Sequence, residues 1–203
     1  MHCSDAGLIL EHFQHTLQSE TAGIAQIYCA QLPIDDLGAG FREDIQVPVY
    51  CSSADRLATN VWLGLGACTP LHWDAHDNLI AQVCGRKHVR LYSPAESRRL
   101  YPFQAEAEGP RNASRIVNIA EAEADPNAWP GFVDAQYQKC WLEEGDMLYI
   151  PQRWWHAMQS ERPTVMRHRS NEPAGAKRAY NISVNFWFAQ SQPVDDVSNV
   201  MTL

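Results

Sequence analysis

Short runs of β-forming residues, each closed by a turn residue, dominate the chain from residue 61 to residue 188. Gly, Pro, Asn or Asp separates one run from the next, and the runs are rich in Val, Ile, Leu, Trp, Phe and Tyr. The expected strands are VWLGLG (61–66), LHWD (71–74), NLIAQVC (78–84), KHVRLYS (87–93), KCWL (139–142), MLYI (147–150), WWHAMQ (154–159) and NISVNFWF (181–188). Many short strands with such punctuation favour a β-sandwich or a barrel, and the jelly roll is one such fold.

Helices are expected at the margins of this β-rich region. Apolar residues recur at helical intervals over residues 8–18, and Pro94 can open a short helix over residues 95–101. Residues 33–48 look irregular. Residues 103–138, rich in Ala, Glu and Pro, read as an insertion with little sheet, and residues 160–180 as a polar loop. Because no domain break is visible, residues 1–203 are expected to form a single domain with an all-β core and flanking helices.

The overall charge argues against several classes of partner. The chain has 203 residues, a formal net charge of -8 and a pI near 5.4, whereas a nucleic-acid binder normally carries a basic surface.

No apolar run is long enough to span a membrane, and the first residues lack the apolar stretch of a secretory signal. The six cysteines form no CxxC pair, so we expect reduced thiols and a cytoplasmic or nuclear location.

The segment TPLHWDAHDN (69–78) carries candidate metal ligands. Alternate side chains of a strand share a face, so His72 and Asp74 can chelate one ion. His156, in the Trp-rich segment WWHAM, is the candidate for a third ligand. Two His and one carboxylate form the ligand set of non-haem Fe(II) oxygenases, which leaves coordination positions open for a co-substrate and O2. Zinc accepts the same ligands, so the residues alone do not choose the metal.

His76 and Asp77, later in the same segment, leave an alternative open. His76 would share the face of His72 and Asp74 if the strand continued. A turn at Asp77-Asn78 is expected instead, which would direct His76 to solvent or to a neighbour of the ligands. A zinc hydrolase built on the same ligands would need a base near the metal, and His76 or Asp77 would be its candidates.

A polar face runs through the last expected strand. Asn181, Ser183 and Asn185 alternate with apolar residues. A polar inner face suits a ligand-filled barrel, because a dry core would leave these groups without partners.

At this point the sequence resembles a known family. The segments 69–102, 143–156 and 181–188 are similar to the JmjC-domain oxygenases of the cupin superfamily, and in particular to the small hydroxylase branch that includes jumonji-domain-containing protein five. The resemblance implies a double-stranded β-helix, or jelly roll. It also implies a dioxygenase that binds Fe(II) through His72, Asp74 and His156 and uses 2-oxoglutarate and O2.

The resemblance also implies roles for residues around the metal. Lys87 matches the lysine that pairs with the distal carboxylate of 2-oxoglutarate, and Tyr28 matches a tyrosine whose hydroxyl joins it there. Thr69 and Asn78 match polar residues that contact the co-substrate, although both are also ordinary turn residues. The expected substrate pocket comprises Gln31, Trp62, Asn185 and Trp187. For the two tryptophans and Tyr28, packing in the core is the alternative.

The substrate implied by the resemblance is a protein or peptide side chain, as in arginyl hydroxylases. The alternatives are N-methyl-lysine demethylation, hydroxylation of RNA or of a small molecule, and a non-catalytic, metal-holding cupin that binds peptides. Two departures from the family bear on substrate choice. About two dozen residues precede the region around Tyr28, fewer than in close relatives, and residues 160–180 look longer than the matching connection.

Overall fold

The structure, a computed structural model, describes residues 28–51, 56–64, 66–161 and 181–189. The helix predicted over residues 8–18 and nearly all of the predicted polar loop lie outside these residues. The described strands are β1 (Tyr28–Pro33), β2 (Arg56–Gly64), β3 (Cys68–Trp73), β4 (Asp77–Cys84), β5 (Lys87–Tyr92), β6 (Gln138–Leu142), β7 (Met147–Ile150), β8 (Trp155–Ser160) and β9 (Asn181–Phe188). The described helices are η1 (Ile34–Leu37), α2 (Ala39–Asp44), η2 (Pro94–Leu100), α3 (Ile119–Ala124) and η3 (Phe132–Asp134), the η elements being 3-10 helices.

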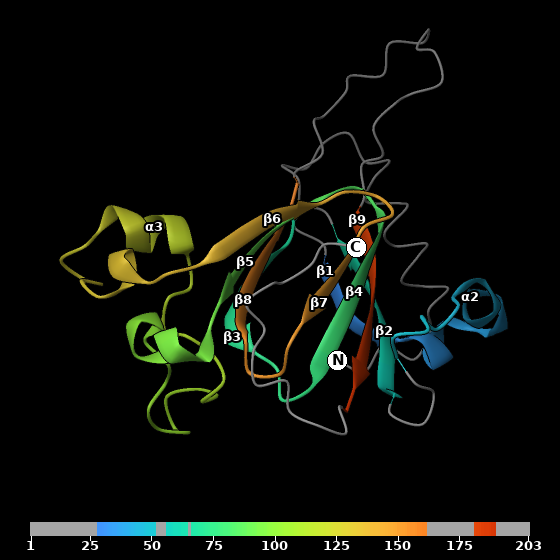
Figure 1. Cartoon of the computed structure of the whole chain (residues 1–203), viewed down its shortest axis with the longest axis horizontal. Coiled ribbons are helices and arrows are strands. Elements are labelled where there is room, and N and C mark those ends of the chain that lie inside the picture. Colours follow the sequence, from blue (N-terminus) through green and yellow to red (C-terminus); the bar gives the residue numbers. More distant parts are fainter. Residues whose placement is uncertain (1–27, 52–55, 65, 162–180, 190–203) are drawn as a thin grey trace, which may run out of the picture.

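The nine strands form two antiparallel sheets that face each other. One sheet has the order β1-β2-β9-β4-β7 and the other the order β3-β8-β5-β6. Figure 1 shows them as two layers, with α3 outside the four-stranded sheet and α2 beyond the five-stranded sheet. This arrangement is the predicted jelly roll. The eight predicted strands are confirmed, although β2 and β3 begin earlier than expected, at Arg56 and Cys68.

The alternation of side chains along β9 explains how one strand can serve both a core and a cavity. Ile182, Val184, Phe186 and Phe188 pack against apolar residues on the outer face of the five-stranded sheet, including Leu37 and Ile45. The intervening residues of β9 are Asn181, Ser183, Asn185 and Trp187, and all but Asn181 line the space between the sheets. Because the side-chain period of a strand is two, the same eight residues separate an apolar face from a polar one.

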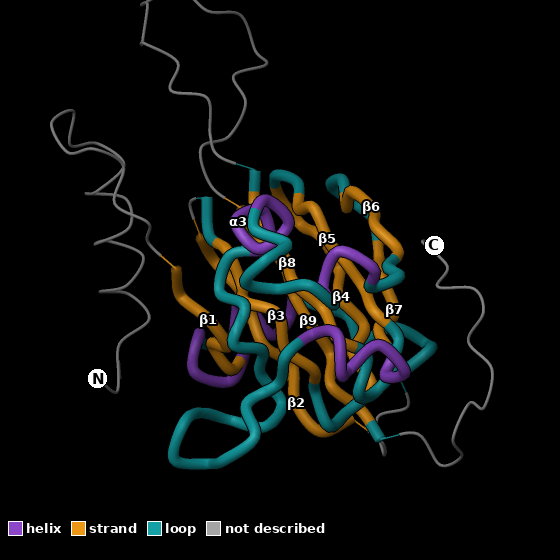
Figure 2. The backbone as a smooth tube through the Cα atoms, turned by 90° about the vertical axis from the view of Figure 1, so that its left-hand side faces the viewer, coloured by secondary structure: helices purple, strands orange, loops and turns teal. Residues whose placement is uncertain are grey.

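The insertion covers the outer face of the four-stranded sheet. From that side, its loops and helices run across the strands (Figure 2). Ile116 and Phe132 of the insertion, with Leu100 of η2 before it, pack there against Leu71 and Trp155 of the sheet. Arg90 of β5 and Glu123 of α3 add an ion pair of 2.5 Å. Apart from Gln138 at the start of β6, the described pairing of this segment consists of isolated bridges, in agreement with the prediction of little sheet.

Four details differ from the sequence-based expectation. Residues 33–48, expected to be irregular, contain η1 and α2, and β1 was not predicted at all. The helix after Pro94 is a 3-10 helix. The turn predicted at Asp77-Asn78 is wrong, because both residues are buried at the start of β4 and the chain turns at residues 74–76 instead. None of the described helices is long and apolar enough to cross a membrane.

Candidate metal centre and co-substrate cavity

Strand pairing brings the three predicted metal ligands together. His72 of β3 and His156 of β8 are Cα partners in the antiparallel ladder, and their rings lie 4.2 Å apart between centroids. Asp74 follows one residue after the end of β3. One ligand atom from each of the three side chains lies within 4.8 Å of the others. Asp74 is therefore placed by the turn after the strand, whereas the predicted strand extended through it.

Backbone carbonyls orient both imidazoles. Nδ1 of His72 lies 2.8 Å from the carbonyl oxygen of Pro70, and Nδ1 of His156 lies 3.0 Å from that of Trp154. A carbonyl oxygen can only accept, so each Nδ1 carries the proton and each Nε2 keeps its lone pair. These Nε2 atoms lie 3.7 Å and 3.8 Å from the two carboxylate oxygens of Asp74. Four electron-rich atoms thus face a common point.

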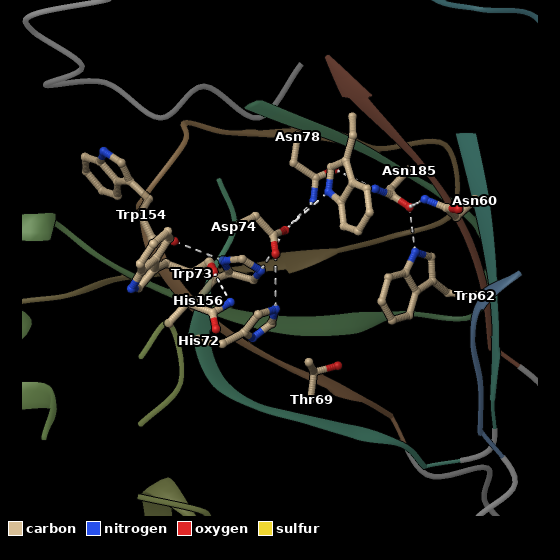
Figure 3. A network of polar contacts seen from close by, with 12 residues as sticks. Asn60, Trp62, Thr69, His72, Trp73, Asp74, Asn78, Trp154, His156 and Asn185 are labelled. Atoms are coloured by element: carbon tan, nitrogen blue, oxygen red, sulfur yellow. Dashed lines mark hydrogen bonds and ion pairs between the residues drawn. The ribbon is translucent and has the colours of Figure 1, made fainter. Parts of the chain in front are cut away.

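Two hydrogen bonds hold the Asp74 carboxylate from the other side. Asn78 Nδ2 and Trp187 Nε1 donate to its Oδ2 over 3.4 Å and 3.3 Å. Figure 3 shows Asp74 between the imidazoles on one side and Asn78 on the other. Outer partners of this kind fix the direction of a metal-binding carboxylate.

The donor set fits a divalent cation. His156 is buried, and its pKa is lowered because burial and the neighbouring His72 both disfavour the imidazolium. A neutral imidazole is the form that binds metal. Two neutral imidazoles and one carboxylate are the ligands of non-haem Fe(II) sites, which leave other coordination positions to small molecules.

Lys87 places a positive charge in the interior, at the start of β5. It is 5% exposed, and its ammonium donates to the hydroxyl of Ser183. Among the described residues, no carboxylate lies within ion-pair distance of it. Burial lowers the pKa of Lys87 to about 8. A buried ammonium without a carboxylate partner suits an anionic ligand, whose negative charge would offset the cost of burial.

Two hydroxyls lie on the same cavity. Tyr28 Oη and Thr69 Oγ1 are 3.1 Å apart. Burial raises the pKa of Tyr28, more than the bond to Thr69 lowers it, so the phenol stays protonated and able to donate. In the structure Tyr28 pairs with Thr69, and Lys87 pairs with Ser183. That the Tyr28 hydroxyl joins Lys87 at the distal carboxylate of 2-oxoglutarate stays a prediction.

Asn185 is the centre of a buried polar network. Its Oδ1 accepts from Trp62 Nε1 over 2.7 Å and from Asn60 Nδ2 over 3.3 Å, and its Nδ2 donates to Asn78 Oδ1 over 3.0 Å. Through Asn78 the network continues to Asp74 (Figure 3). Trp62 therefore lines the cavity and also belongs to the hydrogen-bond network that reaches Asp74.

All eleven predicted site residues line one cavity between the sheets. Together with the open space at its mouth, the cavity encloses about 410 Å³ of empty space. Its lining comprises Tyr28, Gln31, Trp62, Thr69, His72, Asp74, Asn78, Ile80, Lys87, His156, Met158, Ser183, Asn185 and Trp187. Gln31 lies at an irregularity of β1 with φ 53°, a backbone conformation that non-glycine residues adopt mainly where the surroundings impose it.

The sequence placed Ser183 on a polar inner face without giving it a contact, and it gave Ile80 and Met158 no role in this site. The alternation of polar residues on β9 was a signal for Ser183, since Asn181 and Asn185 flank it at the strand period. The two apolar residues gave no signal, because an apolar residue in a strand is usually core.

The two candidate bases of a zinc hydrolase lie apart from the three ligands. His76 is exposed and faces Trp187, with ring centroids 6.3 Å apart. Asp77 is buried and accepts hydrogen bonds from the Tyr149 hydroxyl at 2.6 Å and from the Gln152 amide at 3.2 Å. Neither belongs to the three-residue cluster that can hold a metal.

Comparison with known proteins places this geometry in context. A sequence model described as a cupin-like domain matches residues 5–193. Lysine-specific demethylase 8 of Xenopus tropicalis is 38% identical over 141 residues, which are 66% of this chain and 30% of that protein. Lysine-specific demethylase JMJ30 of Arabidopsis thaliana is 35% identical over 165 residues, 78% of this chain and 37% of that protein. Jumonji C domain-containing protein 5 of Drosophila melanogaster is 33% identical over 141 residues, 66% of this chain and 32% of that protein. The matched region thus spans between 30% and 37% of these relatives' lengths.

Proposed function

The chain belongs to the cupin-like domain family, in its JmjC branch, and on that premise we propose that it is an oxygenase that uses Fe(II), 2-oxoglutarate and O2 to hydroxylate a protein or peptide side chain. The observation that carries the proposal is a single cavity with two features. His72, Asp74 and His156 turn ligand atoms toward one point on its wall, and the same cavity holds the buried ammonium of Lys87. A metal ligand set and a cation for an organic anion are the two features that this chemistry requires.

The chain's own residues would hold the ion from one side. His72 and His156 offer Nε2 lone pairs, and Asp74 offers its carboxylate. When bound, Fe(II) supplies, with 2-oxoglutarate, the reduction of O2 that inserts one oxygen atom into a C–H bond and leaves succinate and CO2. The hydrogen bonds from Asn78 and Trp187 would keep the Asp74 carboxylate in one orientation, beside the two imidazoles, where it could bind the ion.

Lys87, Tyr28 and Thr69 would bind the co-substrate. The Lys87 ammonium would pair with the carboxylate of 2-oxoglutarate that does not chelate the metal. Tyr28 remains a protonated donor, and it shares the cavity wall with Thr69. A carboxylate in this cavity would raise the pKa of Lys87 and restore its full charge, so that binding and protonation support each other.

Trp62, Trp187 and Gln31 would shape the part of the cavity that receives the substrate. The two indoles line it with apolar surface, while their N–H groups are engaged with Asn185 and Asp74. Apolar walls exclude water from the reacting atoms, and this favours oxidation of the substrate over side reactions. The net charge of -8 would attract a basic peptide at long range.

Demethylation of N-methyl-lysine is a second candidate, because two of the relatives described above are named as lysine-specific demethylases. Both reactions insert oxygen into a C–H bond. When the carbon is an N-methyl group, the hydroxymethyl product releases formaldehyde, so the same site would serve both outcomes.

Ligand binding without oxygen tests the proposal. Anaerobic protein titrated with Fe(II) and 2-oxoglutarate should develop the weak visible charge-transfer absorption of a chelated 2-oxo acid. The variant His72→Ala should lose it, whereas His76→Ala is the matched control and should retain it, because His76 is exposed and outside the ligand cluster. Absence of the absorption in the unmodified protein would refute the proposal.

Turnover and mass spectrometry then separate the reaction classes. Under O2, consumption of 2-oxoglutarate with release of succinate distinguishes an oxygenase from a non-catalytic peptide-binding cupin. Candidate peptides that gain one oxygen atom indicate hydroxylation, and peptides that lose a methyl group with release of formaldehyde indicate demethylation. Turnover only with RNA or with a small molecule would reassign the substrate class.

A further inference from the structure

The outer edge of β3 is covered by residues of the insertion. One side of β3 pairs with β8, and its other side pairs with residues 112–114. His72 and Ala113 form an antiparallel bridge, and Ser114 N donates to Leu71 O over 2.9 Å. The strand that carries a metal ligand is therefore bounded on both sides.

Asn112 binds the backbone of Trp73, the last residue of β3, which lies between His72 and Asp74 in the chain. Its backbone oxygen accepts from Trp73 N over 2.9 Å, and its side-chain Nδ2 donates to Trp73 O over 2.9 Å. Both polar groups of the Trp73 backbone are thus bound by one residue. The side-chain amide takes the place of the backbone N–H that a continuing strand would offer, at the point where the ladder ends.

These contacts reach Asp74 through its backbone. The Trp73 carbonyl belongs to the peptide plane before the Asp74 Cα, and the Asp74 carbonyl belongs to the plane after it. Asn112 Nδ2 holds the first, and Arg153 N holds the second over 2.8 Å. Because a residue's φ and ψ are the rotations of these two planes, the two hydrogen bonds together restrict the backbone of Asp74 and the direction of its Cα–Cβ bond, from which the carboxylate extends.

Hydrogen bonds hold the backbone of the insertion on both sides of Asn112. Ala113 N donates to Pro110 O over 2.9 Å, which closes a turn around Asn112, and Phe103 N donates to Ala113 O over 3.2 Å. The buried hydroxyl of Ser114 donates to Leu100 O over 2.6 Å and accepts from Ile116 N over 2.9 Å. A side chain on a backbone fixed in this way positions its hydrogen-bond partner more precisely than a side chain on a loop without such contacts.

We propose that Asn112 is a positioning residue for the metal centre, and that the insertion holds Asp74 in its metal-binding orientation through the Asn112–Trp73 contact. This inference rests on the proposed function, since it takes Asp74 as a metal ligand. It gives the insertion a role in the site although the insertion contributes none of the residues that line the cavity.

The test compares two asparagines of the insertion. Asn112→Ala removes the donor to Trp73. Asn118→Ala is the control, because Asn118 caps α3 by accepting from Ala120 N and Glu121 N and makes none of the described contacts with β3. Both variants should lower the melting temperature. Asn112→Ala should weaken Co(II) affinity, followed by visible absorption, by about tenfold, and Asn118→Ala should leave it within about twofold.

A second variant and a metal-free measurement complete the test. Asn112→Asp keeps the shape but turns a carboxylate oxygen toward the Trp73 carbonyl, so it should weaken Co(II) affinity at least as much as Asn112→Ala. In the apo protein, the amide of Arg153 should exchange with solvent about fivefold faster in Asn112→Ala than in Asn118→Ala, the factor that one lost hydrogen bond carries.

Equal Co(II) affinity in Asn112→Ala and the unmodified protein, or equal weakening in both asparagine variants, would overturn the inference and leave the metal site intact. Failure of the unmodified protein to bind Co(II) would instead refute the proposed function, and the inference with it. In that case a difference in Arg153 exchange would reflect local backbone support alone.

Discussion

His72 and His156 are direct partners across the β3–β8 ladder, with ring centroids 4.2 Å apart. The carbonyl of Pro70 orients the ring of His72, and the carbonyl of Trp154 orients the ring of His156. Both rings therefore turn Nε2 toward Asp74. The candidate metal centre therefore depends on the register of two strands, because a shift by one residue would turn one imidazole to the opposite face of the sheet.

The variant Lys87→Met is expected to be more stable than the unmodified protein in the absence of ligands near pH 7. Burial lowers the pKa of Lys87 from 10.5 to about 8, so the folded state holds an ammonium that it disfavours. The gain is at most roughly 3 kcal/mol in the free energy of unfolding. Urea unfolding at a series of pH values measures it.

The same experiment has a defined pH dependence. From about pH 8 to pH 10.5 the unfolded chain binds more protons than the folded one at Lys87, so the unmodified protein gains stability as pH rises. The advantage of Lys87→Met should therefore shrink through this window. A variant that is less stable than its parent at pH 7 would contradict the assignment of an unpaired buried ammonium.

Bound 2-oxoglutarate is expected to raise the melting temperature of the unmodified protein and not that of Lys87→Met. With Mn(II) in place of Fe(II) to prevent turnover, a ligand at a hundredfold excess over its Kd adds about 3 kcal/mol of stability. Arg90→Met is the matched control. It removes a cation from the same strand, but Arg90 pairs with Glu123 of the insertion, and the shift should persist. Equal loss in both variants would indicate general electrostatic attraction rather than a specific contact.

Replacing Asn185 with Ala should cost about 2–4 kcal/mol of unfolding free energy, because Trp62 Nε1 and Asn78 Oδ1 would lose their partner in the interior. It should also weaken Co(II) affinity about tenfold, since Asn78 would no longer be held against Asp74. Asn181→Ala, on the same strand, removes buried hydrogen bonds to Gln82 and Arg86 that do not reach the metal centre. Asn181→Ala should lower the free energy of unfolding without changing the Co(II) affinity. Calorimetry and Co(II) titration of both variants measure this, and an equal loss of Co(II) affinity in the two would contradict the prediction.

The free energy of unfolding of the Tyr149→Phe variant is expected to fall less steeply above pH 10 than that of the unmodified protein. Burial and the hydrogen bond to Asp77 raise the pKa of Tyr149 above its usual value of 10.0. Above pH 10 the folded state therefore retains a proton that the unfolded chain releases, and the free energy of unfolding falls as pH rises. Tyr50→Phe, at an exposed phenol, is the control. Identical slopes above pH 10 in Tyr149→Phe and the unmodified protein would count against this account.

The sequence was informative where structure follows from local pattern. Strand β9 was predicted with its observed ends because polar residues at 181, 183 and 185 alternate with apolar ones and an aromatic run follows. Strand β7 was predicted because Pro151 and the turn at Gly145 bound four apolar residues. The prediction of a turn at Asp77-Asn78 was wrong because it also rested on local residue type alone. Asp and Asn favour turns, but the buried bonds of Asp77 to Tyr149 and Gln152 hold it in a strand.

By itself, then, the sequence determined the strand-rich fold, the types of residue that can hold a metal and the face of β9 that lines the cavity, since the period of a strand is encoded by adjacent residues. Tertiary structure alone decided that His156 lies opposite His72, that Asn185 supports Asp74 through Asn78, that Lys87 meets Ser183, and that Asn112 covers the edge of β3. These contacts join residues far apart in the chain, and their formation depends on which strands pair and in which register. Side-chain packing and hydrogen bonding across the whole fold select that pairing.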